Sequence, residues 1–481
     1  MLALTLADLA AMIHGSVHGS VHGAEDAATR VIDGPVTVDS RRVVPGSIFV
    51  AMRGETTDGH LYVDDAVAAG AALVIAEHPL KNDVDQIVVT DASAALSALA
   101  HGVVARVRAH GTLKVIGITG SNGKTTTKNL LREILAGVGE TVAPEGSFNN
   151  HVGAPLSMLA VTDTTRYLVV EMGASGVGEI SRLVKIATPD IAVVLKVGLA
   201  HAGVFGGIER TRLAKAEIVT DLPPTAVAIL NGDDYRVASM AGLTAARVRT
   251  FGIDDDLDVR ADDIEVSLAG TSFVATVDGA THPVRMRILG EHHVMNVLAA
   301  LSVAAELGLD IPAAIAVIER VSRAERWRME VLERPDGVII INDAYNASPD
   351  SMAAALKTLA QLARLGHRSI AVLGEMAELG EYARDEHDTI GRLVVRLNVA
   401  QLVAVGYGAR HIQTAAGLEG SWDGESILVA DVDEAYNILQ PMLRPGDIVL
   451  VKSSKSANLR FLGDRLAGLG TTAGSPALAD P

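Results

Sequence analysis

The sequence predicts an α/β protein built from three domains. Its length of 481 residues corresponds to about three domains at roughly 150 residues each. Short, nearly continuous apolar runs alternate with Ala-rich helical patterns, which is typical of parallel strands buried on both faces. One such run leads through a glycine-rich turn into a helical pattern, "VIGITGSNGKTTTKNLL" at 115–131. We therefore expect a small N-terminal α/β domain, a central P-loop-type domain with a mostly parallel sheet, and a C-terminal doubly wound, Rossmann-like domain.

The N-terminal domain is expected to span residues 1–105. "SIFVAM" and "AALVIAE" have the composition of strands, and "YVDDAVAAG" that of a helix between them. The following run, "HGVVARVRAHGTLK", is expected to link this domain to the next strand. Histidines recur at spacing four in "HGSVHGSVHG", but the glycines between them disfavour the helix that would bring them to one metal. We expect a turn-forming duplication there and assign it no function.

The central and C-terminal domains are expected to span residues 106–322 and 323–470. "KVIGITG", "RYLVVEMG", "DIAVVLKVG" and "TAVAILNGDD" are the central strand candidates, and each ends in a glycine, a carboxylate or another polar residue. "GVIIINDAYN", "RSIAVLGEM", "QLVAVGYG" and "DIVLVKSS" repeat the signal in the third domain. Ligands of open α/β sheets bind beyond the carboxyl ends of the strands, so these polar ends are the candidate sites. The tail at 471–481 is expected to be disordered.

The composition excludes several classes of function. The formal net charge of −17 argues against a surface for nucleic acid or acidic membranes, which need a basic face. The absence of cysteine removes disulfides, thiolate catalysis and cysteine-bound zinc. The start, "MLALTLADLAAMIHG", lacks a basic segment and is broken by Asp8, so we expect no signal peptide. No apolar run is long enough to span a membrane, and we expect a cytoplasmic protein without membrane insertion.

The glycine-rich turn predicts a nucleotide triphosphate site. It is a tighter version of the Walker A loop, because Ile118 stands where that motif begins with glycine. Glycines let the backbone approach phosphate, and the N-terminus of the following helix favours an anion. Lys124 suits the β- and γ-phosphates and the Thr125 hydroxyl suits Mg²⁺. We therefore expect a nucleotide triphosphate to be bound, in an ATPase-type central domain, by Gly120, Ser121, Asn122, Gly123, Lys124, Thr125 and Thr126.

Other polar residues carry weaker signals. Glu171 ends a buried strand and is either a solvated strand end or, as we expect after a phosphate loop, a Mg²⁺ ligand. His201 and Lys215 lie in "HAGVFGGIERTRLAKAE", where each taken alone is more typical of a surface or cap residue. His293 and Asn296 either contact a base edge or cap a helix. In "INDAYNASPDSM", 341–352, polar residues follow a strand run, which suggests a site facing the nucleotide across a domain cleft.

Four motifs in order, "TGSNGKTTT", "EMG", "GEHHVMN" and "DAYNASPDS", resemble those of the Mur ligase superfamily, ATP-dependent amide-forming enzymes of peptidoglycan synthesis. The resemblance covers nearly the whole chain. "GSFNNHVGAPLSML", "NDAYNASPDSM" and "VLGEMAELGEYARDEH" are similar to the branch that adds a dipeptide. The resemblance implies that D-alanyl-D-alanine is joined to a UDP-linked muramyl tripeptide through an acyl phosphate, with release of ADP and phosphate. It also implies Mg²⁺, in two sites, and we expect a monomer.

The resemblance implies residue roles. In the central domain, Lys124 would hold ATP phosphates, Thr125 and Glu171 one Mg²⁺, and His201 a second, with Lys215 carbamylated. Asn296 would contact adenine, while Arg328 and Asp343 of the third domain would reach ATP. The catalytic set would be Lys124, Lys215, His201, Arg328 and Asp343. The substrates would contact Ser40, Arg41, Arg53, His60, Asn149, Asn150, Tyr345 and Asn346.

Some positions depart from the family pattern. His293 stands where Asn is usual, so base recognition would depend more on Asn296. Ser348 replaces a more familiar Asn, and "SSKSA" differs from the usual Gly-Ser-Arg or Gly-Ser-Lys pattern. A free Lys215 would be a cation that repels Mg²⁺, whereas carbamylation by CO₂ would make it an anion; an unmodified helical lysine near Glu217 is the alternative. The proton acceptor for the attacking amine stays open between His201 and Asp343.

Two other functions compete with this one. A folylpolyglutamate synthetase belongs to the same superfamily, but it would not need the N-terminal segment "DSRRVVPGSIFVA", which resembles a uridine-nucleotide module. A non-catalytic nucleotide switch is the alternative from a different class, and it would bind nucleotide without substrate-dependent release of ADP. The sequence does not decide whether the third residue of the tripeptide is diaminopimelate or lysine.

Overall fold

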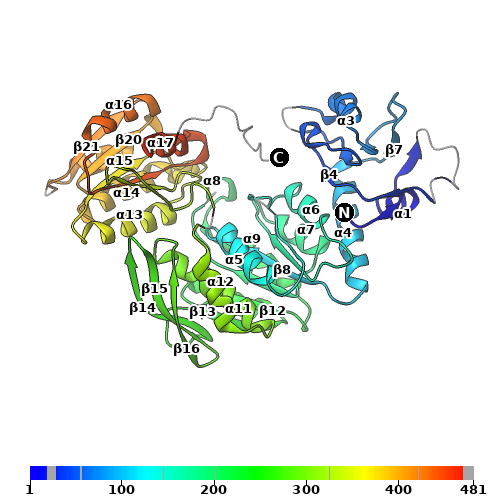
Figure 1. Cartoon of the computed structure of the whole chain (residues 1–481), viewed down its shortest axis with the longest axis horizontal. Helices are drawn as coiled ribbons and strands as arrows, with labels where there is room; N and C mark the ends of the chain where they lie inside the picture. Colours follow the sequence, from blue (N-terminus) through cyan, green and yellow to red (C-terminus); the bar gives the residue numbers. More distant parts are fainter. Residues whose placement is uncertain are drawn as a thin grey trace.

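The computed structural model confirms a three-domain α/β fold, with one main sheet in each domain (Figure 1). The central sheet lies between the N-terminal and C-terminal domains. The exact domain boundaries stay predictions. Within its described part, the chain has no helix long and apolar enough to cross a membrane. The structure describes residues 1–18, 26, 29–54, 57–144, 146–200, 202–323, 325–420 and 422–469.

The N-terminal sheet has the order β2-β7-β6-β5-β4, parallel except for the β2–β7 pair, and β1 and β3 form a separate antiparallel pair. Residues 101–109, which we expected only to link domains, belong instead to the long helix α4, whose N-terminus is capped by the Asp91 carboxylate. The elements are β1 (Leu4–Thr5), α1 (Leu6–Met12), β2 (Ser16–His18), β3 (Val31–Ile32), β4 (Val36–Thr37), η1 (Ser40–Arg42), β5 (Ile48–Val50), η2 (Gly59–Tyr62), α3 (Val63–Ala68), β6 (Leu73–Ala76), β7 (Asp85–Val88) and α4 (Ala92–Ala109).

The central sheet has nine strands in the order β16-β15-β14-β13-β12-β11-β8-β10-β9. Neighbours from β9 to β14 are parallel, whereas β14, β15 and β16 form an antiparallel ladder that the sequence analysis did not predict. The strands are β8 (Lys114–Thr119), β9 (Thr141–Val142), β10 (Tyr167–Glu171), β11 (Ile191–Val194), β12 (Val227–Asn231), β13 (Arg247–Gly252), β14 (Val259–Ser267), β15 (Gly270–Val277) and β16 (Ala280–Met286).

Helices cover both faces of the parallel part of this sheet. Alternate residues of β8 divide between two cores: Val115 packs with α4 and the N-terminal domain, whereas Ile116 packs with α5 and α11. The first of these cores is therefore shared by the N-terminal and central domains. The helices are α5 (Lys124–Ala136), α6 (Gly153–Met158), α7 (Glu179–Ile186), α8 (Ala202–Phe205), α9 (Ile208–Thr220), α10 (Tyr235–Ala238), η3 (Ser239–Leu243), α11 (His292–Glu306) and α12 (Ile311–Arg320).

The C-terminal sheet has the order β17-β18-β22-β19-β20-β21, parallel except for β17. It is doubly wound, because α13, α14 and α15 contribute to one core and α16 and α17 to the other. The elements are β17 (Glu330–Glu333), β18 (Ile339–Asn342), α13 (Pro349–Ala363), β19 (Arg368–Leu373), η4 (Gly380–Tyr382), α14 (Ala383–Arg396), β20 (Gln401–Val405), η5 (Tyr407–Ala409), α15 (Arg410–Leu418), β21 (Glu425–Val429), α16 (Val432–Met442), β22 (Asp447–Lys452), η6 (Lys455–Ala457) and α17 (Leu459–Leu466).

Candidate active site

The phosphate loop connects β8 to α5 as the sequence predicts. Gly123, at the N-cap of α5, has φ 88°, a conformation that glycine adopts without strain. A Cβ at Gly123 would lie 2.2 Å from Asn296 Oδ1 of α11, so no side chain fits there. The predicted nucleotide residue Asn296 therefore lies directly against the loop.

Lys124 begins α5, and its ammonium folds back over the loop. Its Nζ donates to the carbonyl oxygen of Gly120 at 2.6 Å. Burial lowers the pKa of Lys124, Glu171 opposes this shift, and Arg328 adds to it. The lysine thus lies among the groups that we expect to handle phosphate and metal.

The predicted metal ligands Thr125 and Glu171 lie side by side. The Thr125 hydroxyl is 3.3 Å from Glu171 Oε2 and 3.1 Å from the Ser147 hydroxyl. Mg²⁺–oxygen bonds of about 2.1 Å separate neighbouring ligands of an octahedral site by about 3 Å, which is close to the observed spacing. Glu171 is fully buried; its Oε1 lies 3.4 Å from the Lys128 ammonium, and its Oε2 is the oxygen on the Thr125 side. This pair therefore fits Mg²⁺.

Lys215 is buried on α9, and the structure describes no hydrogen bond or ion pair to its amine. Burial, and to a lesser extent the charge of Lys124, lowers the pKa of Lys215 well below its usual value. Glu217 is not its partner, because its carboxylate accepts from the backbone N–H groups of Gly178 and Ser181 at the start of α7. His201, the predicted ligand of a second metal, lies outside the described residues.

Asn296 belongs to a buried chain of hydrogen bonds. The Thr127 hydroxyl donates to Asn296 Oδ1 at 3.3 Å, and Asn296 Nδ2 lies 3.1 Å from His293 Nδ1. Burial keeps the pKa of His293 well below its usual value, so its ring is neutral. Nδ1 then accepts from the amide and Nε2 carries the proton, and Nε2 has no partner in the described part of the chain. His293 thus presents a donor where the family pattern has an amide.

Arg328 extends from the start of the third domain to the phosphate loop. Its Nη2 lies 3.4 Å from the hydroxyls of both Thr125 and Ser147, and its guanidinium lies 4.2 Å from the centroid of the Tyr345 ring. The residues on either side, Trp327 and Met329, have φ 57° and 49°, a region that costs energy outside glycine. This strained segment directs Arg328 toward the metal-side hydroxyls.

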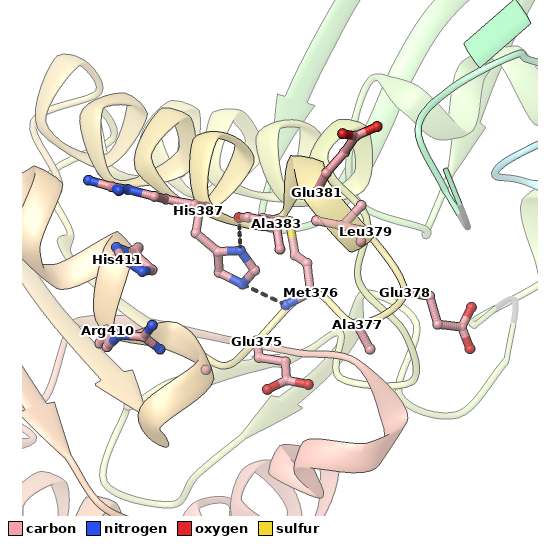
Figure 2. A pocket seen from close by; sticks show the side chains of 13 residues that line it. Glu375, Met376, Ala377, Glu378, Leu379, Glu381, Ala383, His387, Arg410 and His411 are labelled. Atoms are coloured by element: carbon pink, nitrogen blue, oxygen red, sulfur yellow. Dashed lines mark hydrogen bonds between the residues drawn. The ribbon is translucent and has the colours of Figure 1, made fainter. Parts of the chain in front are cut away.

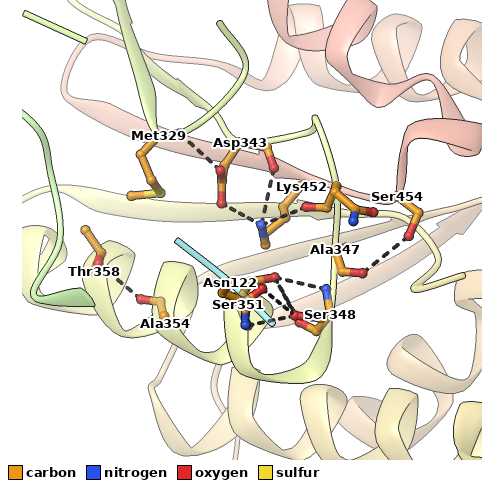
Figure 3. A network of polar contacts seen from close by, with 11 residues as sticks. Asn122, Met329, Asp343, Ala347, Ser348, Ser351, Ala354, Thr358, Lys452 and Ser454 are labelled. Atoms are coloured by element: carbon orange, nitrogen blue, oxygen red, sulfur yellow. Dashed lines mark hydrogen bonds and ion pairs between the residues drawn. The ribbon is translucent and has the colours of Figure 1, made fainter. Parts of the chain in front are cut away.

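Asp343 orients this segment. It follows β18, and its Oδ1 accepts from the backbone N–H of Met329 at 3.1 Å (Figure 3). Its Oδ2 lies 2.6 Å from Nζ of Lys452, which also donates to the carbonyl oxygen of Asn346. Both oxygens of Asp343 thus have partners within the third domain. Because one of these partners is the backbone N–H of Met329, Asp343 fixes the chain next to Arg328.

The "DAYNASPDS" motif contacts the phosphate loop directly. The Ser348 hydroxyl donates to Asn122 Oδ1 at 3.2 Å (Figure 3). Asp350 of the same motif pairs with Lys196 at 3.0 Å. Ser348 also caps α13 by accepting from the backbone N–H of Ser351. The third domain is therefore docked on the central one at the nucleotide site, and Ser348 forms one of the contacts.

The predicted uridine-nucleotide residues Arg41, Arg53 and His60 are paired with neighbouring residues of the N-terminal domain. Arg41 forms a bidentate ion pair with Asp39, and Arg53 lies 3.3 Å from Glu77. His60 Nδ1 donates to the Asp58 carboxylate and Nε2 accepts from the backbone N–H of Glu77, so neither ring nitrogen is available. Ser40 lies in η1 beside Arg41.

The two asparagines before α6 also have structural partners. Asn149 packs against Gly173, whose backbone N–H donates to the Asn149 carbonyl oxygen. Asn150 Oδ1 accepts from the N–H groups of Val152 and Gly153 at the start of α6. Their proposed substrate contacts, like the other predicted roles, stay predictions.

A cavity of about 410 Å³ lies at the carboxyl ends of β19 and β20 (Figure 2). Its lining carries both charges, with Arg384 and Arg410 opposed by acidic residues of the loop after β19. His387 holds that loop, because it accepts from the Met376 N–H at 2.9 Å while its Nδ1 donates to the Ala383 carbonyl. The loop contacts α8 through the Gly203 N–H and the Glu378 carbonyl.

Sequence reasoning missed several charged and polar residues of this region. Lys196 follows β11 of the central domain, Lys452 ends β22 of the third, and Ser147 lies in the "GSFNN" stretch. Lys128 is fully buried one turn after Lys124. Lys124 and Lys128 are four residues apart and therefore share a face of the helix that follows the phosphate loop. This spacing could have predicted that Lys128 lies near the same site.

Three family models match the chain: the "Mur ligase family, catalytic domain" at residues 35–111, the "Mur ligase middle domain" at 118–304, and the "Mur ligase, glutamate ligase domain" at 327–455. The UDP-N-acetylmuramoyl-tripeptide–D-alanyl-D-alanine ligase of Mycobacterium tuberculosis is 43% identical over 505 aligned residues, covering 97% of this chain and 98% of the relative. The enzyme of the same name from Escherichia coli is 31% identical over 475, covering 98% and 100%.

Solved structures agree with these relatives. A crystal structure of MurF from Acinetobacter baumannii is similar with a TM-score of 0.87 at 30% identity, covering 97% of this chain and 99% of that one. MurF ligase from Thermotoga maritima, in complex with ADP, gives a TM-score of 0.79 at 28% identity, covering 91% and 98%.

Proposed function

The chain belongs to the Mur ligase family, and from this premise we propose the reaction that it catalyses. It is an ATP-dependent carbon–nitrogen ligase that joins D-alanyl-D-alanine to UDP-N-acetylmuramoyl-tripeptide, with release of ADP and phosphate. The observation that carries the proposal is the meeting of the phosphate loop with the Thr125–Glu171 pair and with Arg328 of another domain. The full-length similarity to ligases of this name supports the choice of substrates.

The reaction requires activation of a carboxylate, because an amine does not displace hydroxide from it at useful rates. Transfer of the γ-phosphoryl group to the tripeptide carboxylate gives an acyl phosphate, whose leaving group is phosphate. The approach of two anions is unfavourable, and the cations Lys124 and Arg328 offset it while stabilising charge on the transferred oxygens. Docking of the third domain completes the site and keeps water from the acyl phosphate.

Thr125 and Glu171 would hold one Mg²⁺, which supplies charge neutralisation at the phosphates when bound. Lys215 would contribute to a second Mg²⁺ site, after carbamylation of its amine. The lowered pKa of Lys215 favours the neutral amine, which is the form that would add to CO₂ and release a proton to give an anionic carbamate. In this proposal, His201 would be a ligand of the second Mg²⁺.

The acceptor dipeptide is a zwitterion, and the cavity of Figure 2 matches it with charges of both signs beside α8. We place the dipeptide there, with Arg410 near its carboxylate. Arg410→Ala should raise the KM for D-alanyl-D-alanine about tenfold and leave the KM for ATP unchanged, the loss of roughly one charge-assisted hydrogen bond. Equal effects on both constants would argue against this placement.

The test of the proposed function is the substrate dependence of ADP release. ADP should form only when ATP, the UDP-linked muramyl tripeptide and D-alanyl-D-alanine are all present, and mass spectrometry should show the pentapeptide product. Turnover with a folate acceptor would instead identify a folylpolyglutamate synthetase. Nucleotide binding without any substrate-dependent ADP release would identify a non-catalytic switch. Tripeptides ending in diaminopimelate or lysine, compared in the same assay, would identify the third residue.

The expected monomer and the cytoplasmic setting stay predictions. Light scattering on the eluted protein would measure the oligomeric state.

A further inference from the structure

Lys128 is a fully buried lysine on α5, one turn beyond Lys124. Its Nζ donates to the carbonyl oxygens of Pro144 and Gly146, at 2.5 and 2.7 Å. It also lies 3.4 Å from Oε1 of Glu171, whose side chain is equally buried. An ammonium removed from water is costly unless it is paired and hydrogen-bonded, so these three contacts explain why a charge is kept there.

The contact with Glu171 divides the two oxygens of that carboxylate. Oε1 faces Lys128, while Oε2 accepts from the Thr125 hydroxyl on the metal side. Gly146 directly precedes Ser147, whose hydroxyl contacts Thr125 and lies near Arg328. One ammonium thus holds both the carboxylate and the chain segment on either side of Thr125.

We propose that Lys128 is a positioning residue that orients Glu171 so that a single oxygen, Oε2, is presented to Mg²⁺, and that keeps Ser147 beside Thr125. The inference rests on the proposed metal role of Thr125 and Glu171. With Oε1 held by the ammonium, Glu171 binds through one oxygen, as Mg²⁺ with its strict octahedral geometry requires. Ca²⁺ accepts bidentate carboxylates, so the same constraint discriminates against it.

A purely structural lysine would have a different signature. If Lys128 only tied two carbonyl groups to α5, its loss would lower the melting temperature but leave metal affinity unchanged in the molecules that remain folded. If it orients Glu171, metal affinity itself must change. Partners that orient a metal ligand typically contribute about 10- to 100-fold to affinity.

The experiment measures Mn²⁺ binding by electron paramagnetic resonance, with a non-hydrolysable ATP analogue and the full-length protein. Lys128→Met should weaken Mn²⁺ binding about tenfold or more, and the preference for Mg²⁺ over Ca²⁺ in competition should fall. Lys128→Gln keeps N–H donors for the two carbonyls but loses the charge, and it should show the same metal defect with better folding. Lys114→Met, an exposed lysine at the start of β8, is the matched control and should bind as the wild type does.

Wild-type Mn²⁺ affinity in Lys128→Gln would overturn the inference, whatever happens to the melting temperature. If Lys128→Met does not fold, Lys128→Gln decides alone. Because these measurements require no ligation, failure of the proposed reaction would appear separately, as metal–nucleotide binding without product.

Discussion

The phosphate loop and the segment that runs from Trp327 to Asn346 use their polar side chains in opposite ways. In the loop, the groups proposed to bind nucleotide are contiguous in sequence, and the Lys124 ammonium folds back onto the Gly120 carbonyl. In the second segment, Asp343 and Trp327 are occupied by partners inside the third domain, Lys452 and Asp464, whereas the Arg328 guanidinium contacts the Thr125 hydroxyl of the central domain. Under the proposed function, Asp343 would therefore support Arg328 from within the third domain, and Arg328 would be the residue that contacts ATP.

The largest effect should come from the loop. Lys124→Ala removes several charge-assisted contacts with phosphate, each worth roughly 1.5–3 kcal/mol, so kcat/KM should fall about a thousandfold or more. ADP release measures this, and the melting temperature without nucleotide should change little. Activity within tenfold of wild type would refute the assignment of the loop as the ATP site.

Arg328→Ala tests the contact between the second segment and the Thr125 hydroxyl of the central domain. It should lower kcat about 100-fold, the size typical for loss of one donor to developing charge, with a smaller change in the KM for ATP. Arg392→Ala, an exposed arginine of α14, is the control. A change confined to the KM for ATP would mean that Arg328 binds ATP equally in the ground state and the transition state. Arg328 would then contribute to binding and not to the rate of phosphoryl transfer.

Asp343→Asn and Lys452→Met test the supporting role directly. Each leaves a buried partner unpaired, so each should destabilise the folded protein by about 3 kcal/mol and lower kcat about tenfold through Arg328. The double variant should destabilise the folded protein by less than the sum of the two single variants, because neither charge is then left unpaired. Chemical denaturation and kcat measure both effects. Strict additivity would show that Asp343 acts on ATP independently of Lys452.

His292, at the start of α11 between the two regions, gives the smallest expected effect. Burial, reinforced by Lys452 and Lys196 and opposed by Asp343, lowers its pKa from 6.5 to about 4. The folded protein therefore favours the neutral ring, and the stability it contributes is present above pH 6.5 and lost as the pH falls toward 4. Denaturation at pH 7 and pH 5 should show a smaller loss for His292→Gln than for the wild type. The exposed His110→Gln should behave as the wild type does.

The parts of the molecule that the sequence predicted share one property, locality. Continuous apolar runs located the parallel strands, and the loop from Gly120 to Thr125 is contiguous. The antiparallel strands β14 to β16 escaped because β14 alternates buried and exposed residues along much of its length, and one face stays open to water. The pairing of Asp343 with Lys452 joins residues 109 positions apart, and no local sequence pattern predicts such a contact. Nor does any sequence pattern indicate that both ring nitrogens of His60 have partners within the N-terminal domain; its predicted contact with substrate stays a prediction.

The core shared by the N-terminal and central domains has a consequence for how the molecule comes apart. Val103 and Leu99 of α4 pack in one cluster with Leu4 of the first domain and Leu168 of the second, and Arg108 pairs with Asp190 across the junction. One core of the third domain lies wholly within it, and among the described residues the other takes a single buried member, Leu289, from the central domain. A calorimetric trace should therefore resolve two melting units rather than three, with 1–320 cooperating as a single block and the remainder melting by itself.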